Sequence, residues 1–357
     1  MTRASHMGAR GRRGERGVAL LLALLTMVLM TVVVIEFTTS SQVEYRRSAM
    51  WVAGRRAAAV ADSGVMLAGE VLHADFQLGM TDSFQDIWAR ELPPIETGAG
   101  LLTVRIEDEQ GKINLNNLGA GTRTRVRDQI ESLFDKLGLD RTLVSPLADW
   151  IDSNHEPESG PLGAEDAWYA SVKPPYAPRN GPLRSYAELA LVRGFTPAIL
   201  TKLRHFVSVL PETTTKVNVN TASAEVLRSI DPKMDDESLV EKLIAARTAV
   251  PFTSSDGLRT TGGLEAIPKA DLDRLFSFSS DWFRVRSTGA AGDAMRSSEA
   301  LLHRDNGVST IVYLLPRRGP NIVGVDGSAP TGITDAALAG QGPGGSQNLT
   351  GQGPGLR

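Results

Sequence analysis

The densest group of side chains that could do chemistry lies in an acidic stretch, Asp149 to Tyr169, with the sequence DWIDSNHEPESGPLGAEDAWY. Between Asp149 and Asp166 it holds no lysine or arginine and six acids, namely Asp149, Asp152, Glu156, Glu158, Glu165 and Asp166. Carboxylates crowded on one loop repel one another unless a cation neutralises them, and oxygen ligands on a flexible loop suit Ca²⁺ better than Zn²⁺ or Mg²⁺. The stretch is typical of a calcium site, or of a solvated acidic loop in which Asp149 or Asp152 caps a helix.

The stretch is not an EF-hand. Asp152 and Asn154 begin like one, but Glu156 and Pro157 occupy the positions where an EF-hand has an oxygen ligand and a glycine. We expect His155 to face solvent. The aromatic residues near the stretch predict a local core beneath the loop: Trp150, Trp168, Tyr169, Tyr176 and Tyr186. A bound metal would then add folding free energy to a long irregular segment.

Catalytic motifs are absent from the sequence. It contains no cysteine, no G-x-S-x-G, no H-E-x-x-H and no Walker A motif, and its five histidines stand apart. The G-x-G-x-x-G match at 340–345 lies in a low-complexity tail with no strand before it. The sequence therefore predicts a protein that is not an enzyme.

A second polar stretch, KVNVNTASAEVLRSI at 216–230, opens a helical segment, with Thr221 as the expected N-cap. Similar segments introduce helix-hairpin-helix domains, including those of membrane-anchored DNA receptors, and such a receptor is the alternative function. Helix-hairpin-helix modules bind phosphate through glycine-rich hairpins. Here the hairpin at 231–237 holds four acids and no glycine, and the turn at 192–196 offers only Arg193 and one glycine. With a net charge of -3, no nucleic-acid partner is expected.

The elements that would position the acidic stretch begin with an apolar run, Val18 to Ile35. As a helix the run is about 27 Å long, close to the hydrocarbon thickness of a bilayer. Five arginines and one glutamate precede it, so the positive-inside rule places the N-terminus in the cytoplasm. Since no small-x-small cleavage site follows, we predict a retained single-pass anchor.

Beyond the anchor, no proline occurs before Pro93, and apolar residues recur at helical spacing to about Phe76, which predicts one continuous helix. Alternating residues predict an early strand at 101–107 and late strands at 282–286, 298–302 and 308–315. Helical patterns dominate between 122 and 275, apart from a loop at 156–182. The fold class is therefore α+β: a small antiparallel sheet into which a helical domain is inserted. Related stretches at 112–117 and 216–221 indicate a weak internal repeat in that domain.

The basic residues, Gly17 and the following Val-Ala-Leu resemble the class III signal of type IV pilins and pseudopilins. The resemblance implies that prepilin peptidase cuts after Gly17 and that Val18, whose amine is then a candidate for methylation, becomes the first mature residue. Leu22 occupies a position where most members of that family carry glutamate. The absence of this glutamate is typical of one subclass, the minor pseudopilin K (GspK) family of type II secretion systems.

The acidic stretch also resembles that family, whose D-W-x-D and G-A-E-D-x-x-Y patterns fall on 149–152 and 163–169. In the family this stretch binds calcium. By resemblance the Ca²⁺ ligands are Asp152, Asn154, Glu165 and Asp166. Asn154 stands where aspartate is common, which keeps an oxygen ligand but removes one charge.

The resemblance implies a pseudopilin fold with a large inserted α-helical domain of SAM-like or helix-hairpin-helix-like type. The segments expected are a cytoplasmic prepilin leader (1–17), the transmembrane part of the helix (18–35), its periplasmic part and connection (36–92), the first part of the α/β core (93–111), the inserted α-domain (112–275), the C-terminal strands (276–318) and a Gly/Pro-rich disordered tail (319–357). The helix would anchor the chain in the bacterial inner membrane, with the C-terminal domain in the periplasm.

The function implied is that of a minor pseudopilin in the complex that initiates and caps the pseudopilus, for export of folded proteins across the outer membrane. The implied partners are minor pseudopilins I and J, minor pseudopilin H, the major pseudopilin G and prepilin peptidase.

Overall fold

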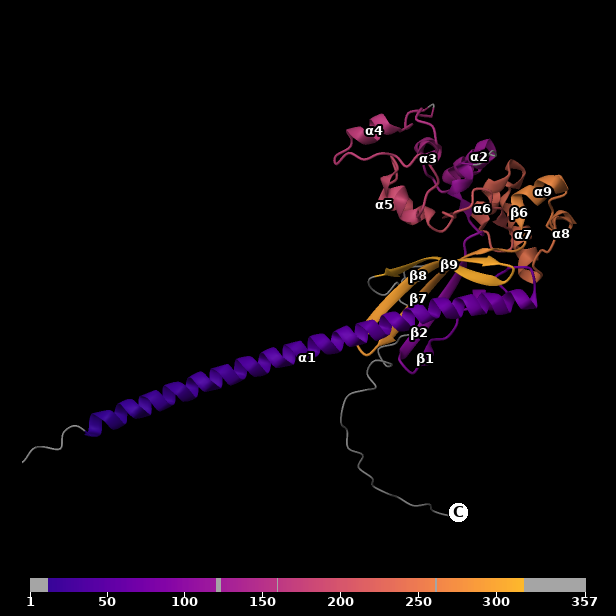
Figure 1. Ribbon diagram of the computed structural model, residues 1–357. Helices are drawn as coiled ribbons and strands as arrows, with labels where there is room; N and C mark the ends of the chain where they lie inside the picture. Colours follow the sequence, from indigo (N-terminus) through magenta and orange to yellow (C-terminus); the bar gives the residue numbers. More distant parts are fainter. Residues whose placement is uncertain (1–11, 120–122, 159, 261, 318–357) are drawn as a thin grey trace, which may run out of the picture.

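The computed structural model describes residues 12–119, 123–158, 160–260 and 262–317 (Figure 1). The expected tail, 319–357, and the expected leader as far as residue 11 lie outside the described residues. The first element, α1 (Arg12–Leu78), is a single helix that ends close to the predicted position.

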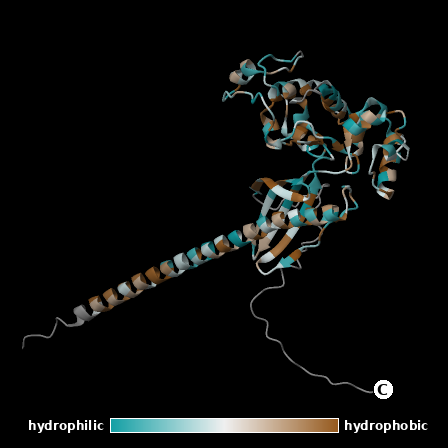
Figure 2. Cartoon of the chain, turned by 45° about the vertical axis from the view of Figure 1, so that its right-hand side comes forward, coloured by the Kyte–Doolittle hydropathy of each residue, from teal (hydrophilic) through white to brown (hydrophobic). Residues whose placement is uncertain are grey.

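The first part of α1 has an apolar stretch, seen as brown turns in Figure 2, and its residues from Val18 to Val52 are exposed. Within the described chain, this is the one helix long and apolar enough to cross a membrane. From Ala57 onward the helix changes character, because small and branched residues at helical spacing become buried: Ala57, Ala61, Val65, Ala68 and Leu72. One helix thus serves two environments.

The buried stripe of α1 covers one face of a five-stranded antiparallel sheet in the order β1-β2-β7-β8-β9. The strands are β1 (Ile95–Thr97), β2 (Gly100–Asp108), β7 (Trp282–Ala291), β8 (Ala294–Asp305) and β9 (Val308–Arg317). Every predicted strand is confirmed, and the sheet joins early and late strands as expected. The short β1 was not predicted.

Two glycines allow the helix to approach the sheet closely. A Cβ on Gly64 of α1 would lie 2.1 Å from the Ser287 hydroxyl, and one on Gly289 of β7 would lie 2.2 Å from the Ala57 carbonyl oxygen. Neither distance is possible for a real side chain. Glycine at both positions therefore sets the spacing between α1 and β7.

The helical domain is inserted into the connection between β2 and β7. These strands are neighbours, with Asp108 paired to Phe283, and the Glu109 amide donates to the Trp282 carbonyl at 3.0 Å. The two ends of the insertion therefore lie side by side, at the end of the antiparallel pair formed by β2 and β7. In Figure 1 the domain lies above the sheet and above the C-terminal end of α1.

The inserted domain consists of short helices and two-residue strands. Besides η1 (Ile87–Ala89) in the connection after α1, the remaining elements are β3 (Ile113–Asn114), η2 (Leu115–Gly119), α2 (Arg123–Lys136), η3 (Arg141–Leu143), α3 (Val144–Ile151), α4 (Asp166–Ser171), η4 (Tyr186–Leu191), α5 (Pro197–Leu203), β4 (Val207–Ser208), β5 (Val217–Asn218), α6 (Ala224–Ile230), η5 (Pro232–Met234), α7 (Glu237–Ala249), α8 (Ser255–Thr260), α9 (Lys269–Leu275) and β6 (Phe276–Ser277). Strand β3 pairs in parallel with β4, and β5 pairs in parallel with β6.

The internal repeat predicted from the two asparagine-rich stretches has a structural meaning. Asn116 bonds both the amide and the carbonyl of Leu183, at 2.8 and 2.9 Å. Asn220 does the same to Phe252, at 2.9 Å for each bond. The second asparagine of each stretch is thus a buried clamp on a distant loop, once in each half of the domain.

Two details differ from expectation. Phe276 pairs through β6 with β5 and packs in the core of the helical domain, so that domain continues through Ser277, beyond the predicted boundary at 275. Thr221 is not the N-cap of α6, because Ser223 caps it. The Thr221 hydroxyl instead donates to the buried carboxylate of Asp108.

Candidate calcium site

The acidic stretch runs between α3 and α4 and is pinned at its base by Asp149. This aspartate is fully buried, and its carboxylate accepts from the amides of Glu158 at 2.8 Å and Ala164 at 2.6 Å. These bonds tie two distant points of the loop to the last turn of α3. Asp149 is therefore a structural carboxylate, and burial raises its pKa.

Glu165 is the residue whose environment is hardest to explain without a ligand. It is 5% exposed, and neither carboxylate oxygen has a hydrogen-bond partner among the described residues. Burial raises its pKa to about 7, and the nearby charges of Asp149 and Asp152 add to the shift. A buried carboxylate without donors is costly unless a proton or a cation neutralises it.

The other predicted ligands lie at the open side of the loop. Asp152 accepts from the Asn154 amide at 3.2 Å, the Asn154 side-chain oxygen accepts from the Glu156 amide at 2.7 Å, and Asp166 lies 2.8 Å from the exposed ring of His155. Within the described parts of the chain, three acids with ligand atoms within 4.8 Å of one another occur elsewhere. The charges of Asp152 and Asp166 are close enough to raise the pKa of Glu165, but the predicted ligand atoms do not converge on one point.

Asn180 is a potential ligand that the sequence analysis missed. Its side-chain nitrogen lies 3.0 Å from the His155 ring, while its side-chain oxygen is buried and has no hydrogen-bond partner among the described residues. The residue has φ = 49°, a left-handed conformation that asparagine tolerates. Because Asn180 lies outside the acidic stretch, nothing in the sequence indicated that it would come close to the loop.

The predicted aromatic core is present beneath the loop. Tyr169 is fully buried, and its ring centroid lies 5.2 Å from that of Trp150, 4.8 Å from that of Trp168 and 5.2 Å from that of Tyr176. The guanidinium of Arg193 lies over Trp168 at 5.1 Å. Tyr186 is farther along, where its hydroxyl donates to the Leu200 carbonyl.

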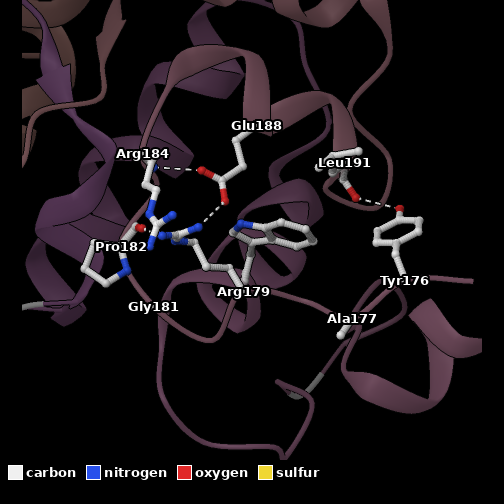
Figure 3. A pocket seen from close by; sticks show the side chains of 9 residues that line it. Tyr176, Ala177, Arg179, Gly181, Pro182, Arg184, Glu188 and Leu191 are labelled. Atoms are coloured by element: carbon white, nitrogen blue, oxygen red, sulfur yellow. Dashed lines mark hydrogen bonds and ion pairs between the residues drawn. The ribbon is translucent and has the colours of Figure 1, made fainter. Parts of the chain in front are cut away.

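An open pocket of about 640 Å³ lies beside these aromatic rings (Figure 3). Its polar side chains are tied to each other, since Arg179 donates to Glu188 at 3.2 Å and to the Pro182 carbonyl at 2.7 Å. The lining contains no serine, histidine or cysteine. The described lining therefore holds no Ser–His or Cys–His pair.

The two stretches that might bind phosphate have other partners. In the 231–237 segment, Asp236 caps α7, and Asp235 pairs with Lys136 at 2.9 Å. Arg193 donates to the Gly163 carbonyl at 3.0 Å and stacks on Trp168. These contacts do not favour the alternative of a DNA receptor.

Comparison with known proteins agrees with the division of the helical domain into halves. Two family models for type II secretion system protein K match residues 111–212 and 217–279. Type II secretion system protein K of Pseudomonas aeruginosa is 32% identical over 291 residues, which covers 77% of this chain and 84% of the relative. This chain belongs to the type II secretion system protein K family.

Other protein K relatives and a solved structure agree. The Aeromonas hydrophila protein K is 27% identical over 299 residues, covering 77% of this chain and 88% of the relative. A crystal structure described as the GspK–GspI–GspJ complex of the enterotoxigenic Escherichia coli type 2 secretion system contains a chain that matches with a TM-score of 0.64 and 21% identity, over 79% of this chain and 99% of that one. The pseudopilin fold predicted for a protein K is thus confirmed.

Proposed function

We propose that this protein K is a minor pseudopilin of the pseudopilus tip, where it assembles with minor pseudopilins I and J. The complex initiates and caps the pseudopilus during export of folded proteins across the outer membrane. The observation that carries the proposal is the relation to the Pseudomonas aeruginosa protein K, because it spans most of both chains. The solved assembly of GspK with GspI and GspJ supports the choice of partners.

We further propose that prepilin peptidase cuts after Gly17, leaving Val18 as the mature N-terminus in the inner membrane, with the folded part in the periplasm. Gly17 is exposed on α1, and a Cβ built on it would meet no atom of the described chain within 4 Å, apart from the neighbouring helix backbone. The apolar residues from Val18 to Val52 remain exposed, so they are free to pack in lipid or against helices of other pseudopilins, including H and G. Leu22 in place of a glutamate suits a terminal subunit, which has no subunit above it to pair with.

A crosslinking experiment tests the assembly. Because the chain has no cysteine, Val43→Cys gives a unique thiol on the exposed face of α1 for a benzophenone label. After illumination of cells, we expect adducts with minor pseudopilins I or J. Glu265→Cys, exposed on the helical domain, is the matched control. Failure of the α1 label to reach either protein would contradict the tip assembly.

The N-terminal mass, measured in cells with and without prepilin peptidase, tests the processing. We expect the mature chain to begin at Val18 only when the peptidase is present. A mature chain that begins elsewhere would overturn this part of the proposal.

We also propose that the acidic loop binds Ca²⁺ through Asp152, Asn154, Glu165 and Asp166. The support is the buried Glu165 carboxylate without a donor, together with the unpartnered side-chain oxygen of Asn180. A hard cation would give the Glu165 carboxylate a partner and offset two of the negative charges of the loop. Addition of a chelator to the full chain in detergent should lower its melting temperature, and an unchanged melting curve would count against the loop site.

A further inference from the structure

A second group of acids lies where α1 ends. Asp75 is in the last turn of α1, and Asp82 and Asp86 follow in the connection to β1. One ligand atom from each lies within 4.8 Å of the other two. Asp75 is 6% exposed and Asp82 is 2% exposed, while Asp86 is partly buried. We call these three residues the junction cluster.

One cation of the protein faces the junction cluster in the described structure. Arg304 of β8 is 4% exposed and lies between the rings of Phe76 and Phe283, at 5.5 and 4.8 Å from their centroids. It donates to Asp82 Oδ2 and lies 3.9 Å from Asp75 Oδ2. Three carboxylates with one guanidinium leave two negative charges to be balanced.

The bonds within the junction cluster leave an oxygen free. Asp82 Oδ2 accepts from the Ser280 amide at 2.7 Å as well as from Arg304, but Asp82 Oδ1 is buried without a partner in the described structure. The Asp86 carboxylate accepts from the Ser83 amide at 2.6 Å, which orients it. Burial and the repulsion of Asp86 and Asp82 raise the pKa of Asp75 to about 6. The ionised cluster is therefore costly as it stands.

The spacing suits a divalent cation. Oxygens that bind one Ca²⁺ at 2.3–2.6 Å can lie at most about 5 Å apart, and the ligand atoms of the junction cluster meet that limit. A hard ion takes oxygen ligands alone, and Ca²⁺ tolerates irregular geometry better than Mg²⁺ does. A charge of two would also balance the excess left by Arg304.

We propose that Asp75, Asp82 and Asp86 form a divalent-cation site, with Ca²⁺ as the preferred ion. The site would fix the joint between the end of α1, the sheet and the helical domain. Asp82 already reaches the end of the insertion through Ser280, and the Gln85 side chain donates to the Thr248 carbonyl of α7 at 2.7 Å. In Figure 1 this joint lies at the far end of α1, beneath the helical domain. The proposal is independent of the acidic loop.

Calcium titration of the full chain in detergent micelles tests the junction site. A loop variant, Glu165→Gln with Asp166→Asn, is used as background so that binding at the acidic loop does not mask the result. In that background we expect CaCl₂ to bind. Adding Asp75→Asn and Asp86→Asn should then weaken binding by roughly tenfold or more, by analogy with the loss caused by disturbing metal ligation. Asp82 is kept because it neutralises the buried Arg304.

Controls separate the junction site from general charge effects. Glu70→Gln removes an exposed acid from the same helix and should leave calcium binding unchanged. Asp86→Asn alone, at the least buried member of the cluster, repeats the test if the double substitution unfolds the protein. Equal calcium binding with and without the junction carboxylates, or no binding in the loop background, would overturn the proposal. If the loop variant binds less calcium than wild type does, that difference tests the acidic loop and not the junction cluster.

Discussion

At the residue scale, the buried Glu165 carboxylate makes the stability of the acidic loop depend on pH, and on Ca²⁺ as well if the proposed site is occupied. Its pKa of about 7 lies above the ordinary value of 4.5, so the folded state holds a proton that the unfolded state has released. The resulting stability is fully present below pH 4.5 and is lost as the pH rises through 7. Without metal, the protein should therefore become less stable between pH 5 and pH 8.

Glu165→Gln should have opposite effects with and without calcium. In a chelator at pH 8 the variant should be more stable than wild type, because position 165 then carries no buried charge. In saturating Ca²⁺ it should be less stable, because a ligand is lost. Urea unfolding midpoints of both proteins at pH 5 and pH 8 measure this, with exposed Glu156→Gln as the control. A variant that follows wild type in all four conditions would contradict the role given to Glu165.

The two asparagine clamps predict a similar weakness in each half of the helical domain. Asn116→Ala and Asn220→Ala each leave a buried amide and carbonyl without partners, so each should lower the free energy of unfolding by about 2–3 kcal/mol. Urea denaturation measures the change, with Gln77→Ala at an exposed position as the control. A cost below about 0.5 kcal/mol, the usual range of surface substitutions, would mean that water replaces the clamp.

Residue roles were predictable where the signal was local. The acids of the loop and the repeated asparagines stand out in the sequence. The role of Thr221 does not stand out, because its hydroxyl donates to Asp108, which lies far away in the sequence on β2. The junction cluster was missed for the same reason, since only the fold brings Arg304 to Asp82.

At the element scale, the contact between α1 and the sheet depends on which glycine is changed. Gly64→Ala would force a methyl group against Ser287 and should destabilise the protein by about 1–3 kcal/mol. Gly69, in the same helix, has only Ser309 at 3.6 Å from an added Cβ, so Gly69→Ala should be neutral or stabilise by up to about 1 kcal/mol. Thermal unfolding of both variants compares the two, and equal effects would contradict the close contact.

The longer elements were predictable because they are long enough for a pattern to show; burial alternates along β2 and β7, whereas residues 297–302 of β8 are all buried and β9 is mostly exposed. Strands β2, β7, β8 and β9 each have nine or more residues, and α1 shows its buried stripe over many turns. The pairs β3–β4 and β5–β6 have two residues on each strand, which is too short for any period. Their parallel pairing depends on contacts between distant segments and could not be predicted.

At the scale of the whole molecule, the helical domain should be removable. Since Glu109 and Trp282 are hydrogen-bonded neighbours, an Asn-Gly turn can replace residues 110–281 and close β2 and β7 into a hairpin. If the bulk of the domain stops growth of the pseudopilus, cells with the excised protein should form longer pseudopili than wild type. Electron microscopy measures their length, and immunoblotting must show that the excised chain accumulates. Pseudopili of wild-type length would contradict the capping role.

The long helix has a mechanical consequence. A rod of about 100 Å with no proline runs from the membrane segment to the sheet, and Arg304 of β8 contacts its last turns at Asp75 and Phe76. Without proline, α1 has no site at which a sharp bend is expected. We therefore expect a displacement or rotation of its N-terminal part to be transmitted along the helix to the sheet, so that the folded domains move with it.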